Sequence, residues 1–247
     1  ERAIYMRPGL TSGISPALVR RHWRGAAVRA AIVSADIAQV PLDALEAALT
    51  LARRGGARIA VDLDLPPSQI LGRTGLGSPG ALSRILAMSH ILKPTLAAAR
   101  EITGAGDPLE AARRLSRGPR IVAVTDGERG AALASARGAW RIPALRVRAA
   151  DATGAGDAFF GGLLAGLRGG LTLRDAGRLA AACGALCVRT AGAFPPPRAR
   201  QRLRGHRLPR LSRLPSRGRP AATPAGSPAS RCLKAAAGAL GRAAQGT

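Results

Sequence analysis

The chain has 247 residues, of which 47% are hydrophobic but only 2% aromatic, and it carries a formal net charge of +24. This length suits one large domain, or one domain with an appendage, and its core must be built from Ala, Leu, Val and Ile. No stretch approaches the roughly 20 consecutive apolar residues of a membrane span, and the start does not resemble a secretory signal. Three cysteines are too few for a disulfide framework, which favours a reducing compartment. We therefore expect a cytoplasmic protein with no membrane partner.

Strand-like and helix-like segments alternate along the first 194 residues. Strands are predicted at Ala30–Ala35, Arg58–Leu63, His90–Leu92, Arg120–Thr125, Ala131–Ser135 and Ala139–Ile142. Helices are predicted at Pro41–Arg53, Ala81–Met88, Thr95–Ile102, Leu109–Leu115, Ala155–Leu167 and Leu173–Val188. This alternation is typical of an α/β domain with a mostly parallel sheet.

The composition changes abruptly after Phe194. Residues 198–247 contain 12 of the 38 basic residues and none of the 14 acidic ones. The stretch Arg198–Arg219 has no helical or strand period, and an Ala-rich segment at Leu233–Ala244 allows at most a frayed helix. We therefore predict a domain at 1–194 followed by a disordered Arg/Pro/Ala-rich tail at 195–247. The unopposed charge predicts salt-sensitive, non-specific nucleic-acid binding through 198–247, although a GC-rich genome explains the arginine content equally well.

The segment Asp151–Gly162 is the most informative in the chain. Its small residues Gly154, Ala155 and Gly156 form a turn before a predicted helix, where backbone N–H groups and partial positive charge favour an anion. Asp157 falls in the first helical turn, where a carboxylate can accept the proton of an attacking hydroxyl. From spacing alone, an ordinary capped helix start explains the pattern equally well.

This segment reads D-A-T-G-A-G-D-A-F and resembles the D-x-T-G-A-G-D-x-F signature of the ribokinase-like (PfkB) carbohydrate kinase family. Further segments resemble the family in order and spacing, and together they extend the resemblance over about residues 1–194. They are Glu1–Val19, Val61–Asp64, Leu92–Gly104, Val124–Gly130 and Gly192–Ala193. The resemblance implies an α/β fold of the ribokinase type, a three-layer αβα sandwich with a mostly parallel sheet, incomplete here.

The resemblance also implies an activity, the ATP-dependent phosphorylation of a hydroxyl on a sugar or nucleoside-like small molecule. Asp157 would be the catalytic base. The anion hole for the transition state would consist of Gly154, Ala155 and Gly156. The resemblance further implies Mg²⁺ bridging the phosphates, mostly through water, and a homodimer, because many relatives pair.

Further site residues follow from the same resemblance. The residues expected along the nucleotide are Thr125, Gly127 and Gly130. Asp151 and Thr153 match positions that face a monovalent cation such as K⁺ in some members.

Three departures from the family pattern bear on activity. The family's Asn-x-x-Glu, which helps to organise Mg²⁺ and phosphate, falls on Thr95 and Ala98, and Glu101 lies one helical turn too far along. Thr95 keeps a hydroxyl in the Mg²⁺ and phosphate region, whereas Ala98 offers no ligand. The N-terminal third of the family pattern is absent, and the tail replaces its final strand and helix, as in a fragment or a frameshifted product. We therefore expect a weakly active or inactive kinase.

Two alternatives remain, a non-catalytic nucleotide-binding remnant and a binder of anionic polymers that acts through the tail. Asp62 and Asp64 alternate at the end of a strand, where a site-edge role and plain solvation are equally compatible with the pattern. Cys183 and Cys187 share one helix face and are predicted to be buried thiols rather than metal ligands.

Overall fold

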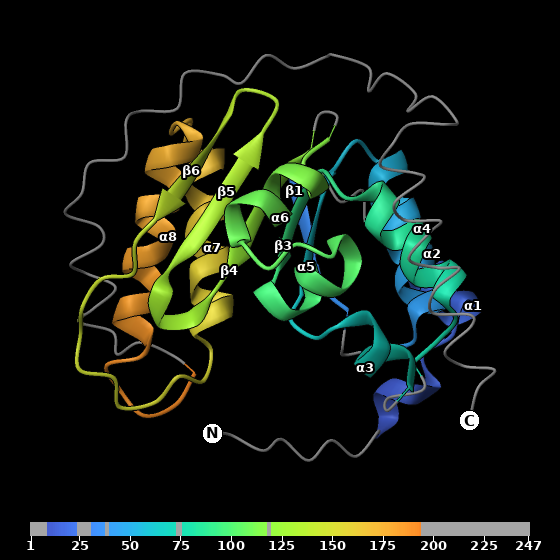
Figure 1. Cartoon of the computed structure of the whole chain (residues 1–247). Helices are drawn as coiled ribbons and strands as arrows, with labels where there is room; N and C mark the ends of the chain where they lie inside the picture. The colour runs from blue at the N-terminus through green and yellow to red at the C-terminus, as the bar shows by residue number, and fades with distance from the viewer. Residues whose placement is uncertain (1–8, 24–30, 38–39, 73–75, 118–119, 194–247) are drawn as a thin grey trace.

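The computed structural model describes residues 9–23, 31–37, 40–72, 76–117 and 120–193 (Figure 1). Their strands form one six-stranded sheet in sequence order. The strands are β1 (Ile32–Asp36), β2 (Arg58–Leu63), β3 (Ile91–Pro94), β4 (Ile121–Thr125), β5 (Ala131–Ser135) and β6 (Gly138–Ile142). Strands β1 to β4 are parallel, whereas β5 and β6 continue the sheet in antiparallel pairs. The mostly parallel sheet predicted from the sequence is confirmed.

Helices connect the parallel strands and close the described chain. They are α1 (Pro16–His22), α2 (Leu42–Arg54), α3 (Pro67–Gly72), α4 (Pro79–Met88), α5 (Leu96–Thr103), α6 (Pro108–Leu115), α7 (Ala155–Arg168) and α8 (Leu173–Cys187). Two short 3₁₀ helices, η1 (Leu10–Gly13) and η2 (Gly127–Arg129), complete the set in this part of the chain. None of the helices in the described ranges is long and apolar enough to cross a membrane.

The sheet is the middle layer of three. Because successive strand residues point to opposite faces, Ile59 and Val61 of β2 join the core under α2, α4, α5 and α6, while Ala60 faces the opposite side. That second core also contains Leu133 of β5 and Leu163 of α7, and α8 covers it as well. Figure 1 shows α7 and α8 paired on one side of the sheet. The three-layer αβα arrangement is therefore confirmed.

Small residues let α7 and α8 approach each other closely. A Cβ at Gly162 would lie 2.8 Å from the Cys183 sulfur, and one at Gly166 would lie 3.0 Å from Ala176. This close packing explains how a chain with so few aromatic residues still forms a second core. It also gives α7 a rigid support, and the predicted signature lies at the start of that helix.

The predicted elements all occur, with ends shifted by a residue or two. Helix α3, which follows Pro66, was not predicted, because two adjacent prolines obscure its short apolar pattern. Some of the predictions fall outside the described residues. They concern residue 30, where the first strand was predicted to begin, the first eight residues, and the tail from 194. The predicted tail disorder and the domain boundary at 194 therefore stay predictions.

Candidate active site

The carboxyl ends of β2, β3 and β4 meet the first turn of α7. The strand register places Asp62 beside Lys93, and an isolated bridge joins Thr95 to Thr125 just beyond β3 and β4. A Cβ at Gly156 in α7 would lie 3.1 Å from the Lys93 ammonium nitrogen, so helix and strands are in direct contact. Segments that the sequence kept apart therefore meet at the edge of the sheet where α/β proteins place their sites.

Asp151 stabilises the turn that precedes α7 through hydrogen bonds. One carboxylate oxygen accepts hydrogen bonds from the Thr153 N–H at 2.8 Å and the Thr153 hydroxyl at 2.7 Å. The other accepts a hydrogen bond from the Gly192 N–H at 3.0 Å, which ties the turn to the segment after α8. Asp151 and Thr153, the residues predicted to face a cation, therefore lie together, and their hydrogen bonds hold the backbone of the turn.

The turn then passes through Gly154, whose backbone is left-handed with φ of 76°. A Cβ there would lie 2.7 Å from the Ala193 carbonyl oxygen, so both conformation and space require glycine. Beneath the turn the buried Cys187 thiol contacts the Thr153 and Ala193 carbonyl oxygens at 3.5 Å. The end of α8 thus supports the turn from below. Cys187 is buried, as the sequence predicted, whereas Cys183 is only partly buried.

Helix α7 begins without a side-chain cap, unlike most helices in the described chain. Five helices have a hydroxyl or carboxylate side chain as their N-cap. They are α1 with Ser15, α4 with Ser78, α5 with Thr95, α6 with Asp107 and α8 with Thr172. Helix α2 also has no such cap, but its Leu42 N–H donates to the Leu76 carbonyl oxygen. The first turn of α7 is thus a helix N-terminus suited to an anionic ligand. Asp157 is exposed in this turn, as the motif requires.

The predicted nucleotide loop follows β4. Gly127 and Gly130 have φ of 54° and 93°, and a Cβ on Gly130 would collide with the Ile142 carbonyl oxygen. The loop closes through a 2.8 Å bond from the Asp126 N–H to the Gly130 carbonyl oxygen. Thr125 stands at the β4 end of this loop, next to β3. The glycines therefore give the loop its shape, and their contact with a nucleotide stays a prediction.

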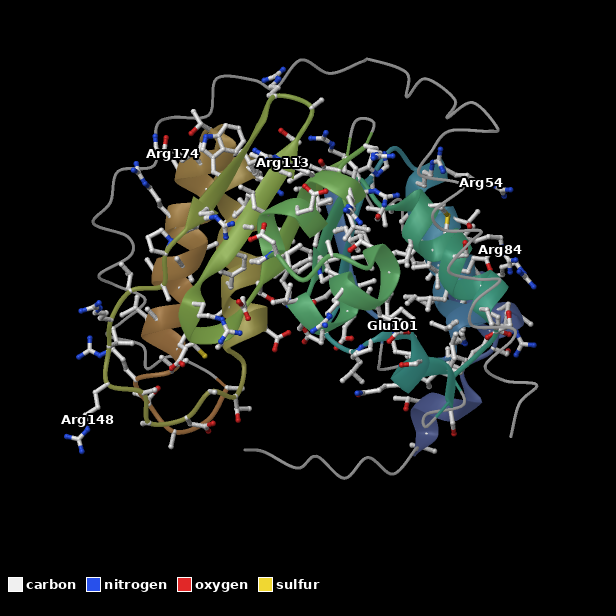
Figure 2. The ribbon with its side chains drawn as sticks, in the orientation of Figure 1. Arg54, Arg84, Glu101, Arg113, Arg148 and Arg174 are labelled. Carbon is white, nitrogen blue, oxygen red and sulfur yellow. The ribbon has the colours of Figure 1, made fainter. Side chains whose placement is uncertain are left out.

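The residues that replace the family's Asn-x-x-Glu have structural partners. The Thr95 hydroxyl accepts from the Ala98 N–H at 3.3 Å and donates to the Asp64 carbonyl oxygen at 3.1 Å. Ala98 is fully buried. Glu101 accepts hydrogen bonds from the N–H and hydroxyl of Ser68 on α3 at 2.8 and 2.7 Å. Glu101, labelled in Figure 2, therefore joins α5 to α3 and does not take the place of the missing glutamate.

Lys93 is the centre of a buried ion cluster. Its ammonium nitrogen lies 2.7 Å from an oxygen of Asp62 and 2.7 Å from an oxygen of Asp64, and the Asp64 side chain is 39% exposed, whereas that of Asp62 is 5% exposed. The contact with Asp64 has hydrogen-bond geometry, whereas that with Asp62 is an ion pair outside such geometry. Burial alone lowers the pKa of Lys93, but the two carboxylates raise it above its ordinary value.

One ammonium cannot neutralise two carboxylates, and Asp62 is the more deeply buried of the two. Burial raises the pKa of Asp62 to about 8; the charge of Asp64 adds to the shift and that of Lys93 opposes it. The cluster is therefore close to neutral below about pH 8 and negative above it. Both carboxylates pair with Lys93, so plain solvation does not describe Asp62 and Asp64, and their role at the edge of the candidate site stays a prediction.

No motif pattern assigns Lys93 a role, and the signal for it lies in the composition. It is one of two lysines, with Lys234, among 38 basic residues. A lysine within a strand, in a chain that otherwise uses arginine, indicates a position where only a compact ammonium fits.

Other features of the described surface lie away from α7's first turn. A pocket of about 510 Å³ lies between α6 and the ends of β5 and β6, and its lining arginines, Arg129 and Arg141, pair with Asp126 and Asp107.

The arginines that are labelled in Figure 2 lie on separate elements around the molecule. They are Arg54, Arg84, Arg113, Arg148 and Arg174.

Comparison with known proteins settles the family. The model of the pfkB family carbohydrate kinase matches residues 1–199. The chain belongs to this family.

Individual relatives agree with this assignment. A probable fructokinase-5 of Arabidopsis thaliana is 41% identical over 83 residues, covering 31% of this chain and 26% of the relative. An aminoimidazole riboside kinase of Salmonella typhimurium is 35% identical over 160 residues, covering 61% and 50%. The chain thus spans half or less of the length of these curated relatives.

Solved structures give the fold independently. A provisional ribokinase II from E. coli, in complex with ATP and Mg²⁺, matches with a TM-score of 0.64 at 22% identity, covering 78% of this chain and 64% of the other. The predicted ribokinase-like fold is therefore confirmed.

Proposed function

We propose that this chain transfers the terminal phosphoryl group of ATP to a hydroxyl of a sugar or nucleoside-like small molecule. The observation that carries the proposal is the start of α7, an uncapped helix N-terminus with an exposed Asp157 in its first turn. Membership of the pfkB carbohydrate kinase family supports the reaction type. The names of the relatives, fructokinase and aminoimidazole riboside kinase, support the two substrate classes.

In the proposed reaction the acceptor hydroxyl oxygen attacks the terminal phosphorus of ATP. The Asp157 carboxylate accepts the hydroxyl proton while the bond between the phosphorus and the bridging oxygen breaks, and ADP leaves. The first-turn N–H groups of Gly154, Ala155 and Gly156 stabilise the charge on the transferred group. Asp151 contributes indirectly, because its three hydrogen bonds hold the backbone that presents these groups.

The nucleotide is proposed to lie along Thr125, Gly127 and Gly130, next to the edge of the sheet where α7 begins. The residues present fit Mg²⁺, since this ion keeps several waters and needs only one or two carboxylates besides phosphate oxygens. Asp64 is the carboxylate best placed to accept hydrogen bonds from such waters, because it is half-exposed beside Gly156. The ion would neutralise phosphate charge. A monovalent cation such as K⁺ at Asp151 and Thr153 is part of the proposal.

The remaining parts of the proposal concern the setting of the enzyme. Residues 1–194 would form the kinase domain and 195–247 an appended tail that binds nucleic acid without specificity. Cys183 and Cys187 are free thiols, in keeping with a cytoplasmic location. Homodimerisation, inferred from the family resemblance, remains open to direct measurement.

The test is ADP release by the full chain with MgATP and a panel of fructose, ribose and nucleosides. Asp157→Asn is expected to lose on the order of 10²- to 10⁴-fold in turnover. Asp175→Asn is the matched control, because Asp175 holds the same first-turn position in α8. Turnover that survives in Asp157→Asn would contradict the assigned base.

A nucleotide-binding remnant is the second candidate, favoured by the capping role of Thr95 and the burial of Ala98. It predicts a thermal shift with MgADP in the full chain but no turnover with any member of the panel.

A further inference from the structure

The first turn of α7 rests directly on the Lys93 ammonium group. A Cβ at Gly156 would lie 3.1 Å from the Lys93 nitrogen and 3.7 and 3.9 Å from the two oxygens of Asp64. The Phe160 ring, one turn further along α7, has its centroid 5.9 Å from the same nitrogen. The absent side chain of Gly156 thus allows close approach to Lys93, whereas the sequence had suggested approach to phosphate alone.

The whole Lys93 side chain is excluded from solvent. Burying a lysine among apolar residues is costly, and two carboxylates at 2.7 Å offset this cost. A buried ion cluster of this kind is poor evidence for stability, because apolar residues of similar volume often serve as well. The position of the charge is the informative feature, since it lies under the helix turn that is suited to an anion.

We propose that Lys93 is a positioning residue for phosphoryl transfer: it holds the first turn of α7 against the ends of β2 and β3 and keeps the charge beneath the anion hole from becoming negative. This inference rests on the proposed function. Lys93 is buried below the backbone and acts through the N–H groups of α7 rather than by touching the phosphate. By balancing the carboxylates, its charge leaves the partial positive charge of the helix N-terminus undiminished.

The charge balance predicts how the site responds when the cluster changes. The charged groups of the neighbouring elements are Asp36 on β1, in register with Asp62, then Asp64, Lys93 and, on α7, Asp157. Lys93 is the only cation among these five. Its removal leaves carboxylates alone beneath the turn, and these would repel the transferred phosphoryl group.

The test compares two ligands by thermal shift, MgADP alone and MgADP with aluminium fluoride, which mimics the group in transfer. Lys93→Met combined with Asp62→Asn keeps the volume of the cluster and avoids stranding two buried carboxylates. We expect this double variant to retain the shift with MgADP but to lose most of the additional shift with aluminium fluoride. Turnover should fall on the order of 10- to 100-fold, with little change in the KM for ATP.

Arg120→Met is the matched control. Arg120 is a partly buried cation just before the start of β4, at the opposite end of the sheet, and it donates hydrogen bonds to the Leu86 and Ser89 carbonyl oxygens. Its loss should lower stability without changing the difference between the two ligands. A double variant that responds to aluminium fluoride like the unsubstituted chain overturns the inference alone, whereas an unsubstituted chain with no response to either ligand overturns the proposed function as well.

A second measurement does not depend on the folding of the Lys93 variant. Asp62→Asn alone keeps Lys93 and the volume of the cluster and removes one carboxylate from beneath the turn. This variant should keep the extra shift with aluminium fluoride, and loss of that shift contradicts the inference.

Discussion

Replacing Asp62 by asparagine is expected to remove a pH-dependent part of the folding stability. Burial raises the pKa of Asp62 to about 8, against an ordinary value of 3.8 in the unfolded chain. The folded protein therefore binds one more proton than the unfolded chain between these two values. This contribution to stability is fully present below the unfolded pKa and is lost as pH rises through about 8.

The magnitude follows from the two pKa values. Between about pH 7 and about pH 9, a group with a folded pKa near 8 loses roughly one pKa unit of stabilisation, or about 1.4 kcal/mol. The change on the acid side, from about pH 4 to about pH 7, is larger, but other carboxylates and His90 also titrate there. The alkaline interval is therefore the cleaner one for Asp62.

The assay is urea unfolding followed by circular dichroism at about pH 7 and about pH 9, with the free energy of unfolding extrapolated to water. The unsubstituted chain should lose about 1.4 kcal/mol more than Asp62→Asn across this interval. The thiols of Cys183 and Cys187 begin to ionise near the upper limit in the unfolded chain, but they are common to both proteins and cancel in the difference. Asp175→Asn is the control. The hydrogen bond from Thr172 lowers the pKa of that exposed carboxyl below its ordinary value of 3.8, so Asp175 stays ionised throughout this interval. Equal pH dependence in the unsubstituted chain and Asp62→Asn would refute the charge balance assigned to the cluster.

Three further predictions can be checked on the same protein. Gly154→Ala should destabilise the fold by about 1–3 kcal/mol in thermal unfolding, because its φ of 76° and the Ala193 contact exclude a side chain. Gly161→Ala should stabilise it by about 0.5–1 kcal/mol, because a Cβ on this exposed helical position meets nothing within 4 Å. Ending the chain at Phe194 should abolish retention on a nucleic-acid column while the thermal shift with MgADP persists, and loss of both would tie the tail to the kinase domain.

The layers of the fold were predictable because they depend on local periodicity. The strand at Arg58–Leu63 was predicted with its observed ends, since its apolar residues Ile59–Val61 and Leu63 lie between a Gly pair and a Pro pair. The start of α7 was predictable for a different reason. A turn that needs a left-handed glycine, followed by an acidic residue in the first turn, leaves an unusual local pattern of small residues.

The ion cluster could not be predicted in the same way, because it depends on contacts between distant segments. Lys93 meets Asp62 only through the register of β2 with β3, and it meets Gly156 only once α7 has packed on the sheet. The sequence therefore indicated each residue as a separate feature. Thr95 illustrates the converse, since its resemblance to a metal-site position gave no sign of the N-cap role that its hydroxyl has in α5.

The choice of lysine at position 93 follows from these same contacts. An ammonium is compact, and this one donates a hydrogen bond to Asp64 and forms an ion pair with Asp62, each at 2.7 Å. A guanidinium is planar and larger, and the space next to Gly156 is already tight, since a Cβ there would lie 3.1 Å from the Lys93 nitrogen. Arginine at this position would have to push α7 away from the sheet, and the first-turn N–H groups would move with the helix. The cluster and the start of α7 are thus one arrangement, in which the missing side chain of Gly156 allows the head group of Lys93 to lie directly beneath the turn.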